Sequence, residues 1–133
     1  MAQTVTPRKV VWKHLRDDPA VSALVGDRIY YQTRPDGAAY PCIVISTISR
    51  IPRRDLDGIA WTETRLQVTA MDTTEPGAEA VAKAIQDSLD GFSSALMAGA
   101  LYVMECRVET AFPMLQEETG QTHYHVDVVI THK

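Results

Sequence analysis

The stretch of sequence that decides the fold reads Trp61-Thr62-Glu63-Thr64-Arg65-Leu66-Gln67-Val68-Thr69-Ala70-Met71. Its side chains alternate in character, residue by residue. The apolar set that points to one side is Leu66, Val68 and Ala70, and the polar set that points to the other is Glu63, Arg65, Gln67 and Thr69. Successive side chains of a β-strand lie on opposite faces, so this pattern predicts a strand with one buried and one polar face.

The residues that follow this strand predict a long helix. The run Asp72-Thr73-Thr74-Glu75-Pro76 offers a threonine that can cap its start and a proline that suits its first turn. An apolar stripe then recurs at helical spacing, formed by Ala78, Val81, Ala82, Ile85, Leu89 and Phe92. Gly91 marks the expected end, since glycine is common just after a helix.

Two shorter helices are predicted near the N-terminus. Thr6 can cap the first, and Pro7 fits its first position, where a missing N–H costs nothing. The run Asp17-Asp18-Pro19 ends that helix and starts the second, which Gly26 terminates. Both carry an apolar face at helical spacing, made by Val10, Val11, His14, Leu15, Ala20, Val21, Leu24 and Val25.

Four further segments predict strands. Residues 28–31 form a short one, and residues 42–49 form one whose apolar start, residues 42–45, indicates cover on both faces. Residues 102–109 and 123–130 alternate with period two around an expected turn at 117–120, which favours an antiparallel pair. In the first of these two strands, the alternation puts Tyr102, Met104, Cys106 and Val108 on one face.

The predicted order is therefore α, α, β, β, β, α, β, β, in one domain over residues 1–133. Such an order favours an α+β fold with a mostly antiparallel sheet and helices packed on one face. The opposite face is polar, yet it also carries apolar side chains, which makes it a candidate packing surface. We expect a subunit interface there, at Trp61, Glu63, Arg65 and Met71.

Composition limits the classes of function. The chain has 133 residues, 45% hydrophobic and 23% charged, with a formal net charge of −4. No overall positive field draws it to nucleic acid or anionic lipid, and no apolar run approaches the length of a membrane span. Residues 1–8 lack the apolar segment of a signal peptide, so we expect a cytoplasmic protein whose Cys42 and Cys106 are reduced core thiols.

Motifs of catalysis and cofactor binding are missing from the sequence. It contains no Gly-x-Ser-x-Gly elbow, no glycine-rich phosphate loop and no cysteine pair at metal-ligand spacing. Asp55 and Asp57 form a carboxylate pair, but turn chemistry before Gly58 explains them better. We therefore expect no enzyme, no cofactor and no metal.

One pattern leaves a metal site open as an alternative. His123 and His125 fall on the same side of a predicted strand, and Asp127 continues that side. His-x-His can begin a metal site, but a complete site needs further convergent ligands, and nothing nearby in sequence supplies them. The other interpretation is a polar, outward strand face.

A charged loop is expected between two strands, over residues 50–60. It holds Arg50, Arg53, Arg54, Asp55 and Asp57, and its two acids nearly balance its arginines. It is either a solvated hairpin loop or a recognition loop that reaches a partner subunit or lines a shared channel. Loops on rigid sheets often carry recognition.

The succession of sequence blocks resembles the tail terminator, or tail completion, proteins of long-tailed phages and gene transfer agents. The resemblance runs from about residue 15 to residue 130, and the order and spacing of the blocks carry it. The blocks are residues 17–30 (DDPAVSALVGDRIY), 40–45 (YPCIVI), 55–58 (DLDG), 65–68 (RLQV) and 78–92, which end in LDGF.

This resemblance implies a structural virion protein with no catalysis. It implies a homo-hexameric ring on the head-proximal end of the tail tube, in the neck region of the virion, after assembly in the host cytoplasm. The ring stops polymerisation of the tube protein and docks to the head connector, and DNA passes through its hole. A head-side stopper or adaptor subunit is the alternative within the same assembly.

Overall fold

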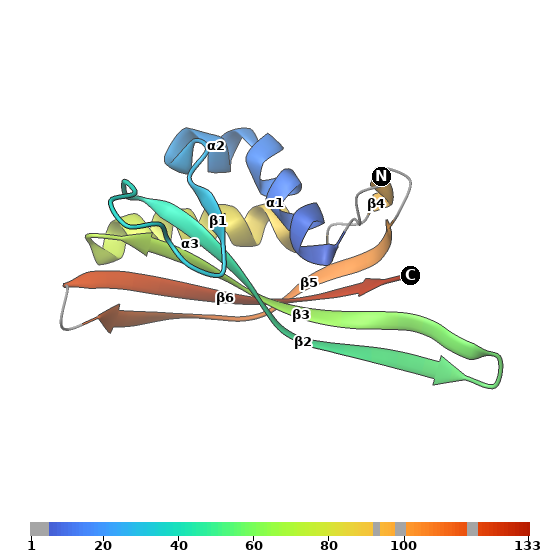
Figure 1. Cartoon of the computed structure of the whole chain (residues 1–133). Coiled ribbons are helices and arrows are strands. Elements are labelled where there is room, and N and C mark those ends of the chain that lie inside the picture. The colour runs from blue at the N-terminus through green and yellow to red at the C-terminus, as the bar shows by residue number, and fades with distance from the viewer. Residues whose placement is uncertain (1–5, 92–93, 98–100, 117–119) are drawn as a thin grey trace.

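The computed structural model describes residues 6–91, 94–97, 101–116 and 120–133. These residues form three helices and six strands, joined by turns and loops (Figure 1). In chain order they are α1 (Pro7–Asp17), α2 (Pro19–Val25), β1 (Ile29–Tyr31), β2 (Cys42–Asp55), β3 (Gly58–Asp72), α3 (Glu75–Leu89), β4 (Ser94–Met97), β5 (Leu101–Gln116) and β6 (Gln121–His132).

The six strands form one sheet in the order β1-β2-β3-β6-β5-β4. Only β1 and β2 pair in parallel, and each of the other neighbouring pairs is antiparallel. The helices all lie on one side of the sheet (Figure 1). The predicted α+β class, with a mostly antiparallel sheet and helices on one face, is confirmed.

Side-chain caps start each helix where the sequence predicts. Thr6 accepts a hydrogen bond from the backbone N–H of Lys9 at 3.2 Å, and Thr74 accepts one from the N–H of Gly77 at 3.2 Å. Each bond satisfies an N–H that has no partner inside the helix.

Among the described residues, no helix combines the length and the apolar character that crossing a membrane requires.

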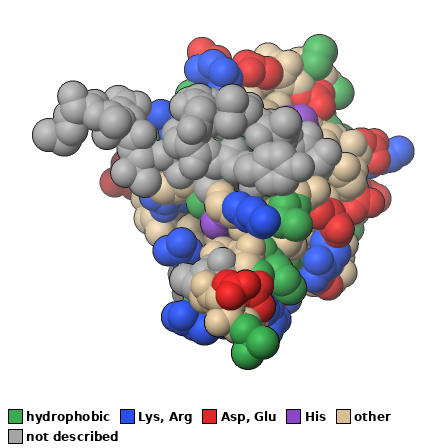
Figure 2. Space-filling model, turned by 90° about the vertical axis from the view of Figure 1, so that its right-hand side faces the viewer, with side chains coloured by type: hydrophobic (Ala, Val, Ile, Leu, Met, Phe, Trp, Pro, Cys, Tyr) green, Lys and Arg blue, Asp and Glu red, His purple; other side chains and the backbone are tan. Residues whose placement is uncertain are grey.

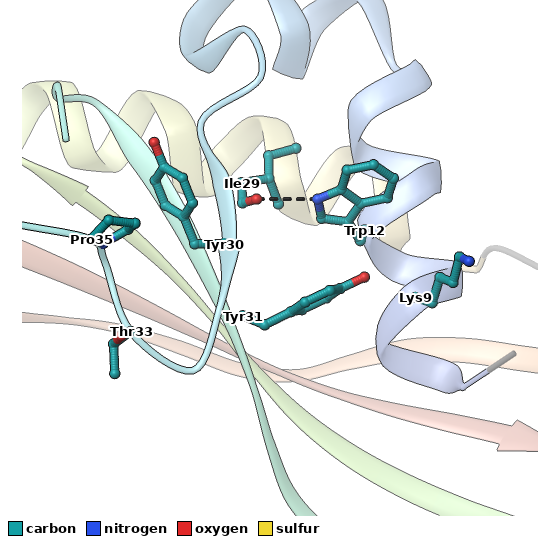
Figure 3. Close-up of a pocket in the computed structure, with 7 residues that line it drawn as sticks. All are labelled: Lys9, Trp12, Ile29, Tyr30, Tyr31, Thr33 and Pro35. Carbon is teal, nitrogen blue, oxygen red and sulfur yellow. Dashed lines mark hydrogen bonds between the residues drawn. The ribbon is translucent and has the colours of Figure 1, made fainter. Parts of the chain in front are cut away.

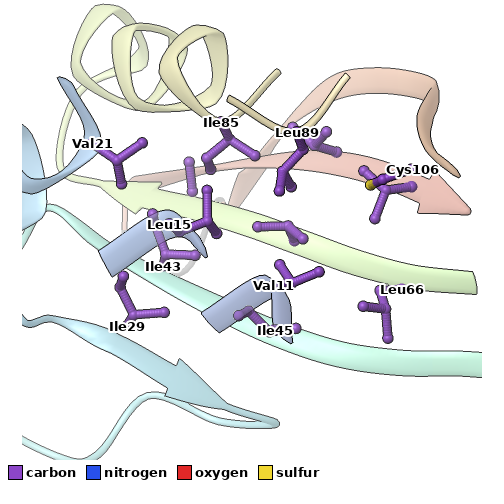
Figure 4. Packing of buried hydrophobic residues seen from close by; sticks show 14 of the residues in the cluster. Val11, Leu15, Val21, Ile29, Ile43, Ile45, Leu66, Ile85, Leu89 and Cys106 are labelled. Atoms are coloured by element: carbon purple, nitrogen blue, oxygen red, sulfur yellow. The ribbon is translucent and has the colours of Figure 1, made fainter. Parts of the chain in front are cut away.

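The core lies between the helices and the inner face of the sheet (Figure 4). The predicted apolar stripe of α3 is buried there, with Phe92 outside the described residues. Strands β2 and β3 contribute Ile43, Ile45, Leu66 and Val68, all fully buried. Full burial of one such side chain contributes about 1.5–3 kcal/mol, so this face dominates the stability of the fold.

The prediction of a loop over residues 50–60 is wrong. Strand β2 continues to Asp55, and β3 begins at Gly58, so Leu56 and Asp57 alone form the turn. Pro52 is tolerated inside β2 because β1 pairs only with residues 43–45, which leaves β2 with a neighbour on one side at that point. A register shift between Thr47 and Ser49 leaves Ile48 as an extra residue in β2 and further breaks the period-two pattern of this strand.

Strand β5 also differs from its prediction. A register shift between Val103 and Glu105 reverses the alternation, so Val103 and Cys106 are both buried while Met104 is exposed. The strand extends to Gln116 instead of ending near residue 109, and the short β4 was not predicted. The expected turn at 117–120 lies outside the described residues except for Gly120.

Both cysteines are buried and unpaired, as predicted. Burial raises the pKa of the Cys42 thiol, and it raises the pKa of the Cys106 thiol to about 12. Thiolate is the reactive form of cysteine, so both groups are chemically inert at neutral pH.

Candidate assembly surface

A two-stranded arm extends the sheet beyond the helices. Strand β6 pairs with β3 only as far as Thr62, so from residue 53 to residue 61 strands β2 and β3 pair with each other alone. Figure 1 shows this arm reaching past the rest of the molecule. We call residues 53–61 the arm. No helix lies over the arm in Figure 1, and residues 53–57 and 61 are exposed, so they can contact another protein.

The tip of the arm presents one apolar side chain between two acids. Leu56 is fully exposed, at 105% of its reference surface. The Asp55 carboxylate accepts a hydrogen bond from the backbone N–H of Asp57 at 2.8 Å, which orders the turn. Gly58 follows with a φ of +122°, a conformation that other residues rarely adopt. The turn therefore holds Leu56 in an outward position.

The five charged residues predicted for the 50–60 loop do not gather into one site. Arg53 lies opposite Trp61 on the outer face of the sheet and makes an ion pair with Glu63 at 2.9 Å. Arg50 pairs with Thr64, whose side chain belongs to the helix-side face. Arg54 lies opposite Ile59, and the two aspartates occupy the tip. The expected charged loop is a strand pair whose charges are distributed over two faces.

The predicted interface residues on β3 do share a face. Trp61, Glu63, Arg65 and Met71 are spaced by even numbers along a strand whose intervening residues are buried toward the helices. Trp61 is 38% exposed. Hydrogen bonds from Arg53 hold the pKa of Glu63 below its ordinary value, so this carboxyl stays ionised.

A shallow hollow of about 200 Å³ lies on this outer face. Val129 of β6 lines it, together with Arg65 and Arg107, its partners on the two neighbouring strands. Three arginines and one glutamate contribute to the lining, which consists of Ser49, Ile51, Arg53, Glu63, Arg65, Arg107 and Val129. Figure 2, which looks at the end of the molecule toward which the arm projects, shows Lys, Arg, Asp and Glu side chains mixed with hydrophobic ones.

The two histidines of the predicted alternative lie on the outer face of β6. Their ring centroids are 6.2 Å apart, and the Nδ1 atom of His125 lies 3.0 Å from the hydroxyl of Thr69. Burial lowers the pKa of both imidazoles, and for His123 the nearby His125 adds to this effect. In the described part of the chain, no group of three or more His, Cys, Asp or Glu is placed to hold a metal ion.

A larger groove, of about 730 Å³, lies between α1 and β1 (Figure 3). The rings of Trp12 and Tyr31 form its walls, with centroids 6.5 Å apart. The indole N–H of Trp12 donates to the backbone carbonyl of Ile29 at 3.1 Å. The guanidinium of Arg8 lies 4.5 Å from the centre of the Tyr31 ring. The groove is thus apolar and aromatic, with cations beside it.

Sequence reasoning did not identify this groove. Its walls come from positions 12 and 31, which only the packing of α1 against β1 brings together. The available signal was an aromatic residue on the edge of each of two short elements, and such residues are common without any groove. The arm was missed for a different reason, because proline and charged residues in β2 imitate a loop.

These features define the chain as a small α+β protein whose exposed surfaces suit contacts with other chains. The family model described as tail completion protein gp17 matches residues 9–132. The chain therefore belongs to the tail completion protein gp17 family, and hence to the structural proteins of phage tails.

A solved structure shows the same fold. One chain in a structure described as the virion of a native gene transfer agent particle superposes with a TM-score of 0.72. The two sequences are 20% identical, and the likeness covers 92% of this chain and 90% of that one. The comparison with curated proteins gave no match.

Proposed function

We propose that this protein forms a ring at the head-proximal end of a phage tail tube. The observation that carries the proposal is the family match over residues 9–132. The ring ends polymerisation of the tube protein, joins the tail to the head connector in the neck of the virion, and leaves a central hole through which DNA passes. Its role is structural, without catalysis or a cofactor.

The surfaces of the subunit support this proposal. A closed ring requires heterologous contacts, in which one patch of each subunit meets a different patch of the next. The tip of the arm and the groove between α1 and β1 are two such distinct patches. The outer face offers Trp61, Glu63, Arg65 and Met71, and the arm with its flank offers Arg50, Arg53, Arg54, Asp55 and Asp57, to a partner subunit or to the lumen.

The charge of the chain also suits a passage for DNA. Its formal net charge is −4, and two arginines of the outer sheet face, Arg53 and Arg107, make ion pairs with Glu63 and Glu109. A strongly basic lumen would hold the phosphates of passing DNA, since each neutralised phosphate adds to affinity. A six-subunit ring of this protein would hold DNA weakly and without sequence preference.

The test is assembly with the cognate tail tube protein. Light scattering should show a species of about six subunits, formed alone or on addition of tube protein, and electron microscopy should show tubes closed by a ring at one end. A protein that stays monomeric and never binds tube ends contradicts the proposal. Density for the subunit on the head side of the neck would instead assign it to the stopper or adaptor proteins.

A further inference from the structure

We propose that the tip of the arm of one copy inserts Leu56 into the groove between Trp12 and Tyr31 of the next copy. This inference rests on the proposed ring and assigns its subunit contact. The occupant is therefore a second copy of this chain, and the two patches differ, as a closed ring requires.

The tip has the chemistry of an anchor. Leu56 exposes its whole side chain at the end of a hydrogen-bonded strand pair, where it makes no contribution to the core. Asp55 and Asp57 flank it, and the hydrogen bond between them fixes the turn before any partner arrives. A preformed tip loses little conformational entropy on docking, which favours its use in recognition.

The groove has the complementary chemistry. Its walls are the aromatic rings of Trp12 and Tyr31, and Tyr31 is 38% exposed. Lys9 is the one charged residue in its lining, and the guanidinium of Arg8 lies beside it on the Tyr31 ring. The seven lining residues that the structure gives include no carboxylate. The tip presents an apolar side chain between two aspartates, and the groove presents an apolar surface beside two cations, so the two are complementary.

The geometry excludes the same contact within one copy. Tyr31 pairs with Ile45 of β2, and the tip lies at the far end of that strand, after Asp55. At about 3.3 Å per residue this part of β2 spans roughly 30 Å, and its extended backbone cannot fold back. Figure 1 shows β1 and the end of the arm well apart.

The groove receives side chains and not a strand. Edge strands often pair with another chain through unpaired backbone groups. Here the outward edge of β1 is occupied locally: Trp12 donates to the carbonyl of Ile29, and the N–H of Thr33 donates to the carbonyl of Tyr31 at 2.7 Å. A partner therefore reaches the groove most readily with a projecting residue, and the tip of the arm supplies one.

Cysteine cross-linking tests this contact directly. The double variant Leu56→Cys with Thr33→Cys places one thiol on the tip and one on the groove lining, while native Cys42 and Cys106 are buried. Oxidation of the assembled protein, with tube protein if the ring needs it, should give a ladder of covalent multimers that ends at the closed ring. Each single variant should give dimers at most.

The rival receptor for the tip is the hollow on the outer sheet face. The variant Leu56→Cys with Ser49→Cys is the matched control, since Ser49 lines that hollow. A ladder from this control, or no ladder from the Thr33 pair although rings form, overturns the inference and leaves the ring proposal intact. Absence of any ring from the unmodified protein overturns both.

The association of variants at the tip and in the groove provides a second measurement. The change Leu56→Ala should weaken association by about tenfold or more, because about three buried methylene-sized groups are lost. The variants Asp57→Lys and Lys9→Glu should each weaken association, and their combination should restore part of it. Equal association of all these variants and the unmodified protein would contradict the tip-to-groove contact.

Discussion

Strands β2 and β3 each run through two different environments, and the contrast separates folding from assembly. Under the helices, Ile43, Ile45, Leu66 and Val68 are fully buried. In and beside the arm, Ile51 is 45% exposed, Trp61 is 38% exposed and Leu56 is fully exposed. One pair of strands therefore both builds the core and presents a surface that the core does not need. A residue's place along the strand decides which role it has.

The largest expected effect comes from a matched pair of substitutions in β2. Ile45→Ala should lower the free energy of unfolding by about 2–5 kcal/mol, because it removes a fully buried side chain and leaves a cavity. Ile51→Ala, the same chemical change six positions along the strand, should lower it by less than about 1 kcal/mol. Urea unfolding followed by circular dichroism measures both.

Equal losses from the two substitutions would erase the proposed division of β2. They would mean that the arm side of the strand is packed in solution, for example against another copy. Repeating the measurement at several protein concentrations separates these cases, since stabilisation by a second copy increases with concentration.

A smaller effect is expected at the start of α3. Thr74→Ala removes the hydroxyl that accepts the hydrogen bond from the Gly77 N–H, and it should lower stability by about 1 kcal/mol. Thr73→Ala is the control, because the cap of α3 is Thr74 and not Thr73. If the two variants were equally stable, the cap would not hold α3 against the sheet.

Much of the fold follows from the sequence for a physical reason. The alternation in β3 and the stripe of α3 each record a face that is buried, and burial is the dominant free-energy term. The predictions that failed concern segments where these burial patterns are interrupted. Pro52 and the nearby arginines suit an exposed, one-sided strand as well as a loop, and the bulge beside Val103 shifts the alternation of β5 by one residue.

The candidate surfaces were only partly predictable. The outer-face residues of β3 could be predicted because period-two alternation assigns every residue of a strand to one of its two faces. The groove was not found, because Trp12 and Tyr31 come from separate elements and nothing in their local sequence encodes their approach. A pairing of this kind depends on how α1 packs across the sheet edge at β1, which only the three-dimensional structure contains.

The pH dependence of stability near neutral pH should arise from residues outside the arm. Burial lowers the pKa of His123, His125 and His132, and the arm contains no histidine. The unfolded chain therefore binds protons at a higher pH than the folded one does. The free energy of unfolding is therefore at its full value above the ordinary histidine pKa of 6.5, where the imidazoles are neutral in both states. It decreases as the pH falls through and below 6.5, because the unfolded chain takes up protons more readily.

Thermal melts between about pH 7.5 and pH 5 check this expectation. The melting temperature should fall with acidification, and the double variant His123→Gln with His125→Gln should show a shallower fall. A melting temperature that is constant over this range would mean that the three imidazoles are as solvated in the folded protein as in the unfolded chain.

The smallest effect on stability is expected at the tip. Leu56→Ser should change the free energy of unfolding by less than about 0.5 kcal/mol, since the side chain is fully exposed and the turn is held by Asp55 and Gly58. The same variant should still fail to form rings or to close tube ends. This combination separates the two roles most sharply, because Ile45→Ala disturbs assembly only by unfolding the subunit. A Leu56→Ser protein that is as stable as the unmodified chain and also assembles normally would show that the arm is not an assembly element at its tip.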